Sequence, residues 1–389
     1  MIVSAQSSSL RDRAREWGRE FRSAGMLLEA EPADAHRFVN LEGVQVMSTA
    51  GIPRSARSAE QSDVVHKLDL RRAVDRTIIM EELARGDVGV FLSAPGPSMA
   101  GLLVDMLGST RQKEDFFAPF LDRPTWSCFA LTEPERGSDA GSLSTAITAD
   151  DSGRLSVNGR KRYIGNGTRA TTGVVFGRRG KSPLSIGAYV IDPTAFGFKA
   201  EALATMGLLA AQISDISFED VALQPEAELG AHLPRGQRGI RASLQVFNQL
   251  RPGVAALALG VSWNAFDTVI EALAGLQVPK LRDRLRRIET ELLSSRELVL
   301  RAARAADETG DGVLASAAKR SLCRQAERVT LDLCSLLGPR ARVDNPALDK
   351  AVRDARGIEF MEGTSNMQVL NVGQSVVTSV RKLRRSTDC

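Results

Sequence analysis

The first third of the chain carries apolar residues at helical spacing. Between residues 9 and 118, apolar side chains recur every three or four positions, and Pro32, Gly51 and Pro53 interrupt the series. This spacing predicts a helical region made of several separate helices. The first has Leu10, Ala14, Trp17 and Phe21 on one face, and later ones are expected near residues 64–85, 98–107 (with Gly108 as C-terminal cap) and 113–121.

From Trp126 to about Leu223 the pattern changes to short apolar runs separated by turn residues. Runs of this length predict strands in a mostly antiparallel β region. One strand is expected to end at Thr132, because Pro134 removes a backbone donor. Residues 151–153 predict a turn and Asn158-Gly159 a tight hairpin; further strands are expected around residues 155–157, 174–176, 186–191 and 213–218.

Helical spacing returns at Gly239 and continues almost to the C-terminus. Apolar positions from Leu257 to Leu273 mark one helix, and longer helices are expected over residues 281–306 and 313–337. The pair Gly338-Pro339 ends the last of these. The order of helical, strand-rich and helical regions predicts an α+β fold.

Composition narrows the classes of function. Of the 389 residues, 43% are apolar and 25% charged, an ordinary balance for a soluble protein. The net charge of +4 suits an anionic partner, such as the phosphates of CoA or an acidic carrier protein, and is too mild to indicate nucleic-acid binding. The four cysteines form no Cys-x-x-Cys pair and the three histidines lack ligand spacing, so we expect no disulfide and no metal site.

We find no pattern typical of a targeting signal or a membrane span. The first 22 residues have no apolar core ahead of their charges. The longest apolar stretch, residues 254–261, is far shorter than the roughly 20 residues that cross a bilayer. We therefore expect a reduced, cytoplasmic protein that binds no membrane.

Two separated patterns carry the functional argument. The first, Leu131-Thr132-Glu133-Pro134-x-x-Gly137-Ser138-Asp139, could by composition alone be an ordinary polar turn at the end of a strand. The second follows Arg353-Asp354-Ala355 and reads Phe360-Met361-Glu362-Gly363-Thr364. Together, and in this order, they resemble the two signatures of the acyl-CoA dehydrogenases, flavoproteins that oxidise the α–β bond of a thioester.

The resemblance covers most of the chain and implies an architecture and a cofactor. It implies an N-terminal α-helical domain over residues 1–125, a central antiparallel β domain over residues 126–235 and a C-terminal helical bundle over residues 236–389. It also implies FAD as the cofactor and an acyl thioester, on CoA or on an acyl carrier protein, as the substrate. A homodimer or homotetramer is expected from the same resemblance.

The chemistry explains why a glutamate is needed at the second signature. Removal of a weakly acidic α-proton requires a carboxylate in apolar surroundings, and the enolate that develops requires hydrogen bonds to the thioester carbonyl. The resemblance makes Glu362 this base and the N–H of Gly363 a donor to the carbonyl. The alternative for Glu362 is a surface glutamate near a helix start, which is the commoner fate of a Glu-Gly pair.

Neighbouring positions bear on the same assignment. Some members carry the base on a helix that is expected to start near Arg251, but the corresponding residue here is Leu250, which has no carboxylate. Arg251 matches an Arg-Pro pair of the family and is expected to contact the substrate or to steer the base. Its alternative is a solvated arginine at a helix start.

The resemblance also assigns the cofactor site. The flavin ring is expected to meet Phe129, Leu131, Thr132 and Gly137, with Ser138 at the boundary between flavin and substrate. A second ring-contacting stretch is Tyr163-Ile164-Gly165-Asn166, in which Tyr163 could instead be an aromatic of the sheet core. Gly338, Thr364 and Asn366 are expected to bind the rest of the cofactor.

Four departures from the family pattern stand out. Gly165 replaces a threonine whose hydroxyl bonds flavin N5, which leaves more room beside the ring. Pro339 replaces a glycine and removes one backbone donor. Residues 274–280 replace an Arg-x-x-Phe-Gly segment that reaches the FAD of a neighbouring subunit, and Pro53-Arg-Ser-Ala-Arg-Ser replaces a glycine-rich loop near the acyl pocket.

Three hypotheses of function follow. The first is an FAD-dependent acyl-thioester dehydrogenase, an oxidoreductase acting on CH–CH bonds that passes electrons to a flavoprotein or to oxygen, with specialised metabolism as a candidate setting. The second is a flavin oxidase or monooxygenase on the same fold, which Gly165 favours by leaving room for oxygen and which Glu362 disfavours. The third is a non-catalytic scaffold that binds a thioester, motivated by the altered cofactor positions.

Overall fold

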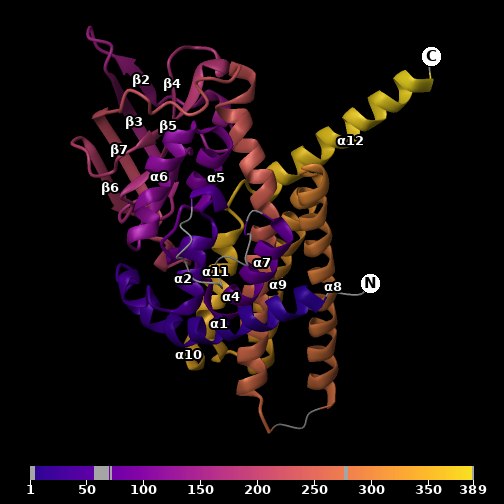
Figure 1. The fold of residues 1–389 in the computed structure, drawn as a ribbon. Coiled ribbons are helices and arrows are strands. Elements are labelled where there is room, and N and C mark those ends of the chain that lie inside the picture. Colours follow the sequence, from indigo (N-terminus) through magenta and orange to yellow (C-terminus); the bar gives the residue numbers. More distant parts are fainter. Residues whose placement is uncertain (1–4, 57–69, 71, 276–278, 388–389) are drawn as a thin grey trace. The chain divides into compact units, whose positions relative to one another are not determined.

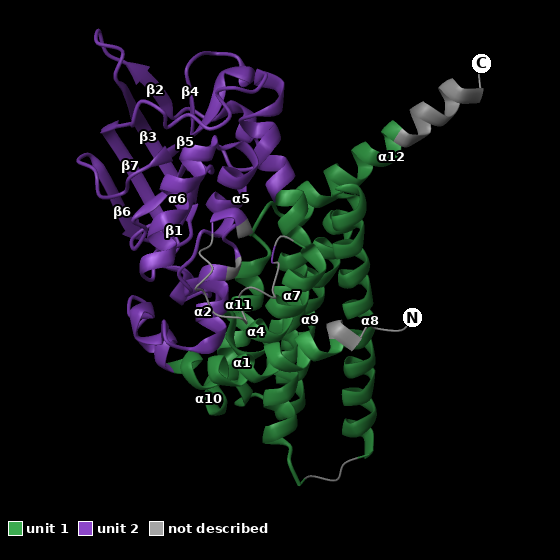
Figure 2. Cartoon of the chain, in the orientation of Figure 1, with its two compact units in different colours: residues 1–26, 72–88, 247–389 green, residues 27–71, 89–246 purple. Residues whose placement is uncertain are grey.

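The computed structural model describes residues 5–56, 70, 72–275 and 279–387, which form two compact units (Figures 1 and 2). Unit 1 comprises residues 1–26, 72–88 and 247–389, and unit 2 comprises residues 27–71 and 89–246. Each unit therefore combines segments that are distant in the sequence. The predicted division into three consecutive domains stays a prediction.

Unit 2 contains one seven-stranded sheet, whose strand order is β1-β4-β2-β3-β7-β6, with β5 also paired to β4. All pairs are antiparallel except β1 with β4 and a single bridge between β2 and β4, so the expectation of a mostly antiparallel region is confirmed. The strands are β1 Ser127–Ala130, β2 Ala146–Ala149, β3 Leu155–Ile164, β4 Thr172–Arg178, β5 Ile186–Ile191, β6 Phe198–Ala202 and β7 Ser214–Ala222.

The sheet core explains which strands could be predicted. Alternate residues of the longer strands are buried together, among them Val157, Val175, Tyr189, Ile216 and Phe218. Strands β2 and β6 were not predicted from the pattern, because each is short and mostly half-buried or exposed. β2 is held by its hydrogen bonds to β3, and β6 by its hydrogen bonds to β7, since neither strand has a fully buried face.

The predicted hairpin at Asn158-Gly159 is wrong. Both residues lie inside β3, where the register with β7 shifts. Gly159 has a φ of +147°, and a Cβ there would lie 2.8 Å from the backbone of Thr145. A glycine is thus required by a bulge and a close approach, not by a turn. The chain does turn at residues 151–152, between β2 and β3, as predicted.

In the described residues of unit 2, three α-helices precede the sheet in the sequence. They are α2 Glu42–Ala50, α5 Ser98–Leu107 and α6 Thr110–Asp122. The bounds of α5 match the prediction, with Gly108 as its C-cap, and α6 begins with a reciprocal capping box between Ser109 and Gln112. The Trp126 indole donates to the Ser93 carbonyl at 2.8 Å, and Asn166 donates to the Leu92 carbonyl at 2.9 Å.

Unit 1 is helical in its described residues. Its long helices are α8 Pro279–Thr309, α9 Val313–Leu337 and α12 Ser365–Thr387, with the shorter α10 Ala341–Asp344 and α11 Pro346–Ile358. The bounds predicted for α9 are confirmed, because its apolar spacing is unbroken and Gly338 ends it with a φ of +85°. Helices α1 Ala5–Ala30, α4 Ala73–Ser93 and α7 Ile240–Ala272 contribute residues to both units.

The helix predicted over residues 64–85 is displaced. Residues 64–69 lie outside the described residues, and α4 runs from Ala73 to Ser93, well beyond Arg85. Asp87 breaks its helical geometry, with φ −160° and ψ +121°. Its carboxylate lies 2.9 Å from the Lys350 ammonium, which also bonds Asp354 at 2.7 Å. This tertiary ion pair stabilises the kink, and the periodicity of α4 does not reveal it.

The segment Arg235–Ala272, within the part of the chain that the structure describes, is long and apolar enough to cross a membrane by length and composition alone. However, 83% of its apolar window is buried inside the protein, as is typical of a core helix. Burial therefore accounts for its composition.

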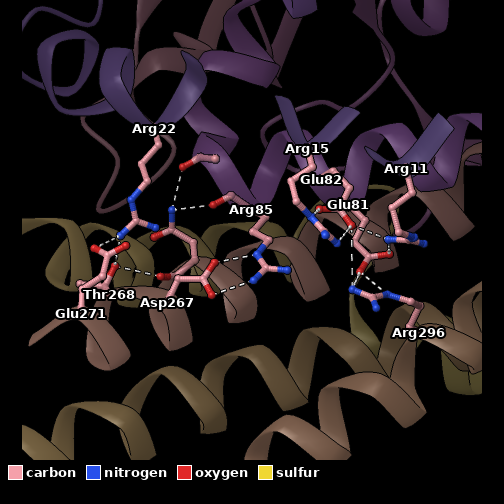
Figure 3. A network of polar contacts seen from close by, with 12 residues as sticks. Arg11, Arg15, Arg22, Glu81, Glu82, Arg85, Asp267, Thr268, Glu271 and Arg296 are labelled. Carbon is pink, nitrogen blue, oxygen red and sulfur yellow. Dashed lines mark hydrogen bonds and ion pairs between the residues drawn. The ribbon is translucent and has the colours of Figure 1, made fainter. Parts of the chain in front are cut away.

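A network of charges in unit 1 links α1, α4, α7 and α8 (Figure 3). Glu81 and Glu82 are each 1% exposed, and the guanidinium groups of Arg11, Arg15 and Arg296 surround them. Burial alone would raise the pKa of Glu82, but the hydrogen bonds and charges of Arg15 and Arg11 lower it overall. Glu82 is therefore ionised and depends on its arginine partners.

Replacing Glu82 tests how much this network stabilises the fold. We expect Glu82→Gln to lower the free energy of unfolding by about 3–5 kcal/mol, because it leaves buried arginine charge uncompensated. Since the pKa of Glu82 is lowered on folding, its contribution is present above the ordinary carboxyl pKa of 4.5 and is lost as the pH falls through the folded value. Denaturant unfolding at neutral and acidic pH measures both effects.

Glu16→Gln is the control for that experiment. Glu16 pairs with Arg13 at 3.5 Å on the exposed side of α1, so its loss should change the unfolding free energy very little. Equal effects of the two substitutions would show that the buried network contributes no more than a surface ion pair.

Candidate active site

Glu362 lies in the tight turn between α11 and α12. Its φ is +52° and that of Gly363 is +94°, so two successive residues adopt left-handed backbone conformations. A glutamate rarely adopts this conformation, and it persists only where surrounding contacts impose it. The turn is therefore a constrained element and not a relaxed loop between two helices.

The Glu362 carboxyl is enclosed although the residue as a whole is half-buried. Its Oε2 is inaccessible and has no hydrogen-bond partner among the described residues. Burial raises the pKa of Glu362 to about 7, while the charges of Arg251, Arg76 and Lys319 oppose the rise. An exposed surface glutamate, the alternative raised by the sequence, does not describe this carboxyl.

Arg251 contacts the same turn from α7. Its Nε donates to the Glu362 carbonyl at 3.3 Å and its Nη1 donates to Asn248 Oδ1 at 2.8 Å. The expected helix start at this residue is wrong, because Arg251 and Pro252 lie inside α7, and only 5% of Arg251 is exposed. Burial lowers its pKa against the opposing charge of Glu362, so the solvated alternative is wrong as well.

Two buried residues beneath the turn were missed from the sequence. The ammonium of Lys319, on α9, donates to the carbonyls of Glu359 at 2.6 Å and Gly363 at 2.7 Å. The amide of Gln368, on α12, donates to the carbonyls of Glu362 at 3.1 Å and Gly363 at 2.8 Å. One signal was available: Lys319 falls on the apolar stripe of α9, beside Ala315 and Leu322, where a lysine is unusual.

The turn also caps the helix that follows it. The Glu359 carboxylate accepts from the Ser365 backbone N–H at 2.6 Å and from its hydroxyl at 2.9 Å, at the start of α12. Among the described residues, the Gly363 N–H has no acceptor. The carbonyls on either side of that amide are thus bonded, while the amide itself remains available to a ligand.

The first signature lies in unit 2, directly after β1. This strand ends at Ala130, two residues before the predicted end, because its parallel pairing with β4 stops there. The chain next pairs with β3, where Arg162 N–H donates to the Thr132 carbonyl at 2.8 Å. The fully buried Lys161 donates to the Leu131 carbonyl at 2.9 Å.

Glu133, inside the signature, is a structural residue that the sequence reasoning overlooked. It is 2% exposed and lies 3.0 Å from the Lys161 ammonium. It also accepts from the backbone and hydroxyl groups of Ser144 and Thr145, at 2.6–2.8 Å. Burial would raise the pKa of Glu133, but Lys161 and these hydrogen bonds lower it to about 2, so the pair is ionised.

The stretch from Tyr163 to Asn166 runs beside the first signature. Tyr163 is 62% exposed, so the alternative of a core aromatic is wrong, and Ile164 is buried. Both Tyr163 and Asn166 have left-handed φ values, +64° and +57°. A Cβ added to Gly165 would meet no atom within 4 Å, so the predicted open space at this position is present.

These two stretches fit a flavin ring in their chemistry. Tyr163 is an exposed aromatic residue, and there is open space at Gly165. Both follow Arg162, whose N–H bonds the Thr132 carbonyl, so they lie beside the backbone of Leu131 and Thr132. The hydroxyls of Thr132 and Ser138 have no hydrogen-bond partner among the described residues, and Gly137 and Ser138 are exposed. Phe129, half-buried in β1, packs on Phe176 with ring centroids 5.1 Å apart.

The remaining predicted residues belong to unit 1. Gly338 ends α9 with open space around it, and Pro339 lacks a donor, as expected from the sequence. Thr364 and Asn366 lie at the start of α12, and Asn366 is exposed. The predicted cofactor residues thus fall into two groups, one in each unit. The structure does not bring Gly338 to Thr364 and Asn366. The turn beside them contacts Lys319 in the first half of α9, whereas Gly338 lies at the far end of that helix, about 28 Å away along its axis.

The described residues contain no cluster of three His, Cys, Asp or Glu side chains of the kind that binds a metal. Cys128 and Cys323 are buried free thiols and Cys334 is a half-buried one, while Cys389 lies outside the described residues.

Known proteins resemble this chain in both sequence and fold. Residues 128–221 match the acyl-CoA dehydrogenase middle domain and residues 237–377 the acyl-CoA dehydrogenase C-terminal domain. The short-chain specific acyl-CoA dehydrogenase of Sus scrofa mitochondria is 32% identical over 324 residues, which cover 78% of this chain and 76% of that protein.

Two solved structures share the fold over nearly the whole chain. A glutaryl-CoA dehydrogenase from Mycobacterium smegmatis in complex with FADH2 has a TM-score of 0.80 at 22% identity, covering 96% of this chain and 95% of that one. The prolyl acyl carrier protein oxidase AnaB has a TM-score of 0.78 at 18% identity, covering 96% and 100%.

The two matched domains and the extended identity lead to one conclusion. The protein belongs to the acyl-CoA dehydrogenase family, whose members are FAD-dependent oxidoreductases acting on CH–CH bonds.

Proposed function

We propose that this protein catalyses the α,β-dehydrogenation of an acyl thioester, with Glu362 as the base that removes the α-proton. The observation that carries the proposal is the enclosed Glu362 carboxyl, which has a pKa raised to about 7 and an Oε2 without a hydrogen-bond partner among the described residues. A general base is most effective when its pKa lies near the working pH. A role as base explains why a buried carboxyl keeps an oxygen that no described residue bonds.

Glu362 and Gly363 have different roles in the proposed reaction. Glu362 takes the proton as the Cα–H bond breaks, and the electrons of that bond form the new double bond as the Cβ–H bond breaks. The Gly363 N–H donates to the thioester carbonyl and stabilises its developing negative charge. FAD, when bound, supplies the acceptor for the β-hydride, which no side chain can accept. The product is a 2-enoyl thioester.

The residues that would hold FAD are those that fit it chemically. In unit 2 these are Leu131 and Thr132 with Gly137 and Ser138, next to the stretch Tyr163-Ile164-Gly165 and near Phe129. In unit 1 they are Gly338, Thr364 and Asn366. We further propose that Ser138 and Arg251 help to bind the thioester.

The carrier of the acyl group is either CoA or an acyl carrier protein. Both are anionic, and the net charge of +4 suits both. The similarity of fold to a prolyl acyl carrier protein oxidase motivates the second choice, as do the replaced loop near residue 55 and the replaced segment at residues 274–280. A role in specialised metabolism, a flavoprotein or oxygen as electron acceptor, a homodimer or homotetramer and a cytoplasmic location stay predictions.

A second candidate function is a flavin oxidase on the same fold. The open space at Gly165 favours it, because a smaller residue beside the ring gives oxygen more room. The enclosed Glu362 is compatible with it only if dehydrogenation comes first. The two candidates differ in what reoxidises the flavin.

The base is tested by Glu362→Gln. We expect the variant to keep FAD but to reduce it with an acyl thioester roughly 10²–10⁴-fold more slowly, because the amide cannot accept the α-proton. Anaerobic stopped-flow bleaching of the flavin measures the rate. Glu114→Gln, on the exposed face of α6, is the control and should react like the wild type. Unchanged bleaching in Glu362→Gln would refute the assignment.

The rate should also depend on pH through Glu362. Only the ionised carboxylate accepts a proton, so with its pKa at about 7 the rate of flavin reduction should fall as the pH drops below 7 and level off above it. The measurement is the anaerobic reduction rate against pH at low thioester concentration, which reports the free enzyme. A rate independent of pH across this range would contradict a base with this pKa.

Gly165→Thr distinguishes the two candidate functions. Because a Cβ at this position meets nothing within 4 Å and the backbone is not left-handed, threonine should fit without loss of stability. If the space admits oxygen, the variant should form less hydrogen peroxide per reduced flavin, while anaerobic bleaching by the thioester persists. Equal peroxide formation in both proteins would remove the argument for an oxidase. Gly236→Thr controls for the added side chain, because Gly236 is exposed, is not left-handed and has no atom within 4 Å of an added Cβ.

A further inference from the structure

The turn that carries Glu362 rests on two fully buried donors from different helices. Lys319 on α9 and Gln368 on α12 are both 0% exposed. Between them they donate to three acceptors, the carbonyls of Glu359, Glu362 and Gly363, at 2.6–3.1 Å. The Gly363 carbonyl accepts from both residues, so the two donors converge on one peptide group.

Because of these contacts, the buried Lys319 ammonium keeps its acceptors only while the turn keeps its conformation. An ammonium without acceptors in a protein interior is strongly unfavourable or loses its proton. Among the described residues, the carboxylate nearest to Lys319 is Glu359 Oε2, at 4.0 Å, so the close acceptors of Lys319 are the backbone carbonyls. If the turn rotated its carbonyls away, Lys319 would lose its hydrogen bonds. The charge therefore opposes any relaxation of the turn.

The turn requires such support because its backbone is strained. A left-handed glutamate is energetically unfavourable and persists only when its surroundings impose it. At the next residue, a Cβ on Gly363 would lie 3.1 Å from Gln368 Nε2, so glycine also permits the close approach of the supporting amide. With the carbonyls of Glu362 and Gly363 directed to buried donors, the Gly363 N–H is left for a ligand.

We propose that Lys319 and Gln368 are positioning residues for the dehydrogenation: by holding these carbonyls they fix the turn that aims the Glu362 carboxylate and presents the Gly363 N–H. This rests on the proposed function of Glu362 as the base. Neither residue touches the substrate in this scheme. Each acts through the backbone of the residue that does.

Charge gives Lys319 a second effect on the base. The charged groups that face Glu362 are Arg251 from α7, Arg76 from α4 and Lys319 from α9, and Glu359 lies in the segment between α11 and the turn. All three cations lower the pKa of Glu362 against the rise that burial causes. Loss of the Lys319 charge should therefore raise that pKa further, whereas loss of the neutral Gln368 amide removes only the positional support.

The test compares Lys319→Met and Gln368→Leu with a matched control in the FAD-loaded full chain. Gln325→Leu is the control, since Gln325 is a buried glutamine of α9 that bonds Glu291 at 2.9 Å and makes no contact with the turn. Three quantities are measured: the melting temperature, the limiting rate of flavin reduction at saturating thioester, and the Glu362 carboxyl titration. The titration uses ¹³C NMR without thioester, with the resonance assigned by its loss in Glu362→Gln.

We expect both variants to reduce bound flavin more slowly by about tenfold or more at saturating thioester, because a small misplacement of a reacting group has that effect. The pKa of Glu362 should rise above about 7 in Lys319→Met. The control should lose stability only, with an unchanged rate per bound flavin and an unchanged Glu362 titration. If both variants lose only stability, as the control does, the positioning proposal is overturned.

The design separates this proposal from the one on which it rests. Should no acyl thioester bleach the wild-type flavin, the proposed function fails, and the NMR titration alone decides whether Lys319 is coupled to the Glu362 carboxyl. Should Lys319→Met fold poorly, Gln368→Leu still decides the role of the turn through its rate. A Glu362 titration that does not change in Lys319→Met would show that the two groups are not coupled.

Discussion

A buried ammonium must have acceptors close by, and both signature segments of this protein depend on that constraint. In unit 2, Lys161 is fully buried and bonds the Leu131 carbonyl and the Glu133 carboxylate. In unit 1, Lys319 is fully buried and bonds the carbonyls of Glu359 and Gly363. Each lysine is satisfied only while a neighbouring non-helical segment keeps the conformation that directs its acceptors to the ammonium. A change in that conformation would therefore destabilise the unit. The segments proposed to meet the cofactor and the thioester are therefore held rigidly.

The two buried lysines find their acceptors in different kinds of group. Lys161 faces an ionised carboxylate that four further hydrogen bonds stabilise, so its charge is locally neutralised and the pKa of Glu133 falls to about 2. Lys319 bonds backbone carbonyls, which carry no net charge, so its positive charge is not neutralised locally and acts on nearby groups. That charge, with those of Arg251 and Arg76, offsets part of the burial at Glu362 and leaves its pKa at about 7. The first pair is purely structural, whereas the second also tunes the proposed base.

The sequence revealed the elements whose signals are local and missed those that depend on distant contacts. Helix α9 was predicted in full because its apolar spacing is unbroken and Gly338-Pro339 ends it. Asn158-Gly159 has the residues of a hairpin turn but lies within β3, because the pairing with β7 continues past it. The resemblance placed Arg251 near a helix start, yet α7 continues through Arg251 and Pro252. The proposed base, Glu362, was found from a motif, whereas Lys319 and Gln368 were found from their contacts with the turn in the structure.

One departure from the family pattern, Gly165, lies where the fold does not depend on the side chain. A Cβ at Gly165 would meet no atom within 4 Å, so this position borders open space and supports no neighbour. By contrast, Lys161, Lys319 and Gln368 are fully buried and bonded to the backbone of the signature segments. A change at the first kind of position alters what faces a bound ligand at little cost in stability, whereas a change at the second kind disturbs the segment itself. The chain can thus differ from its relatives beside the proposed cofactor site while it keeps the geometry of the turn that carries Glu362.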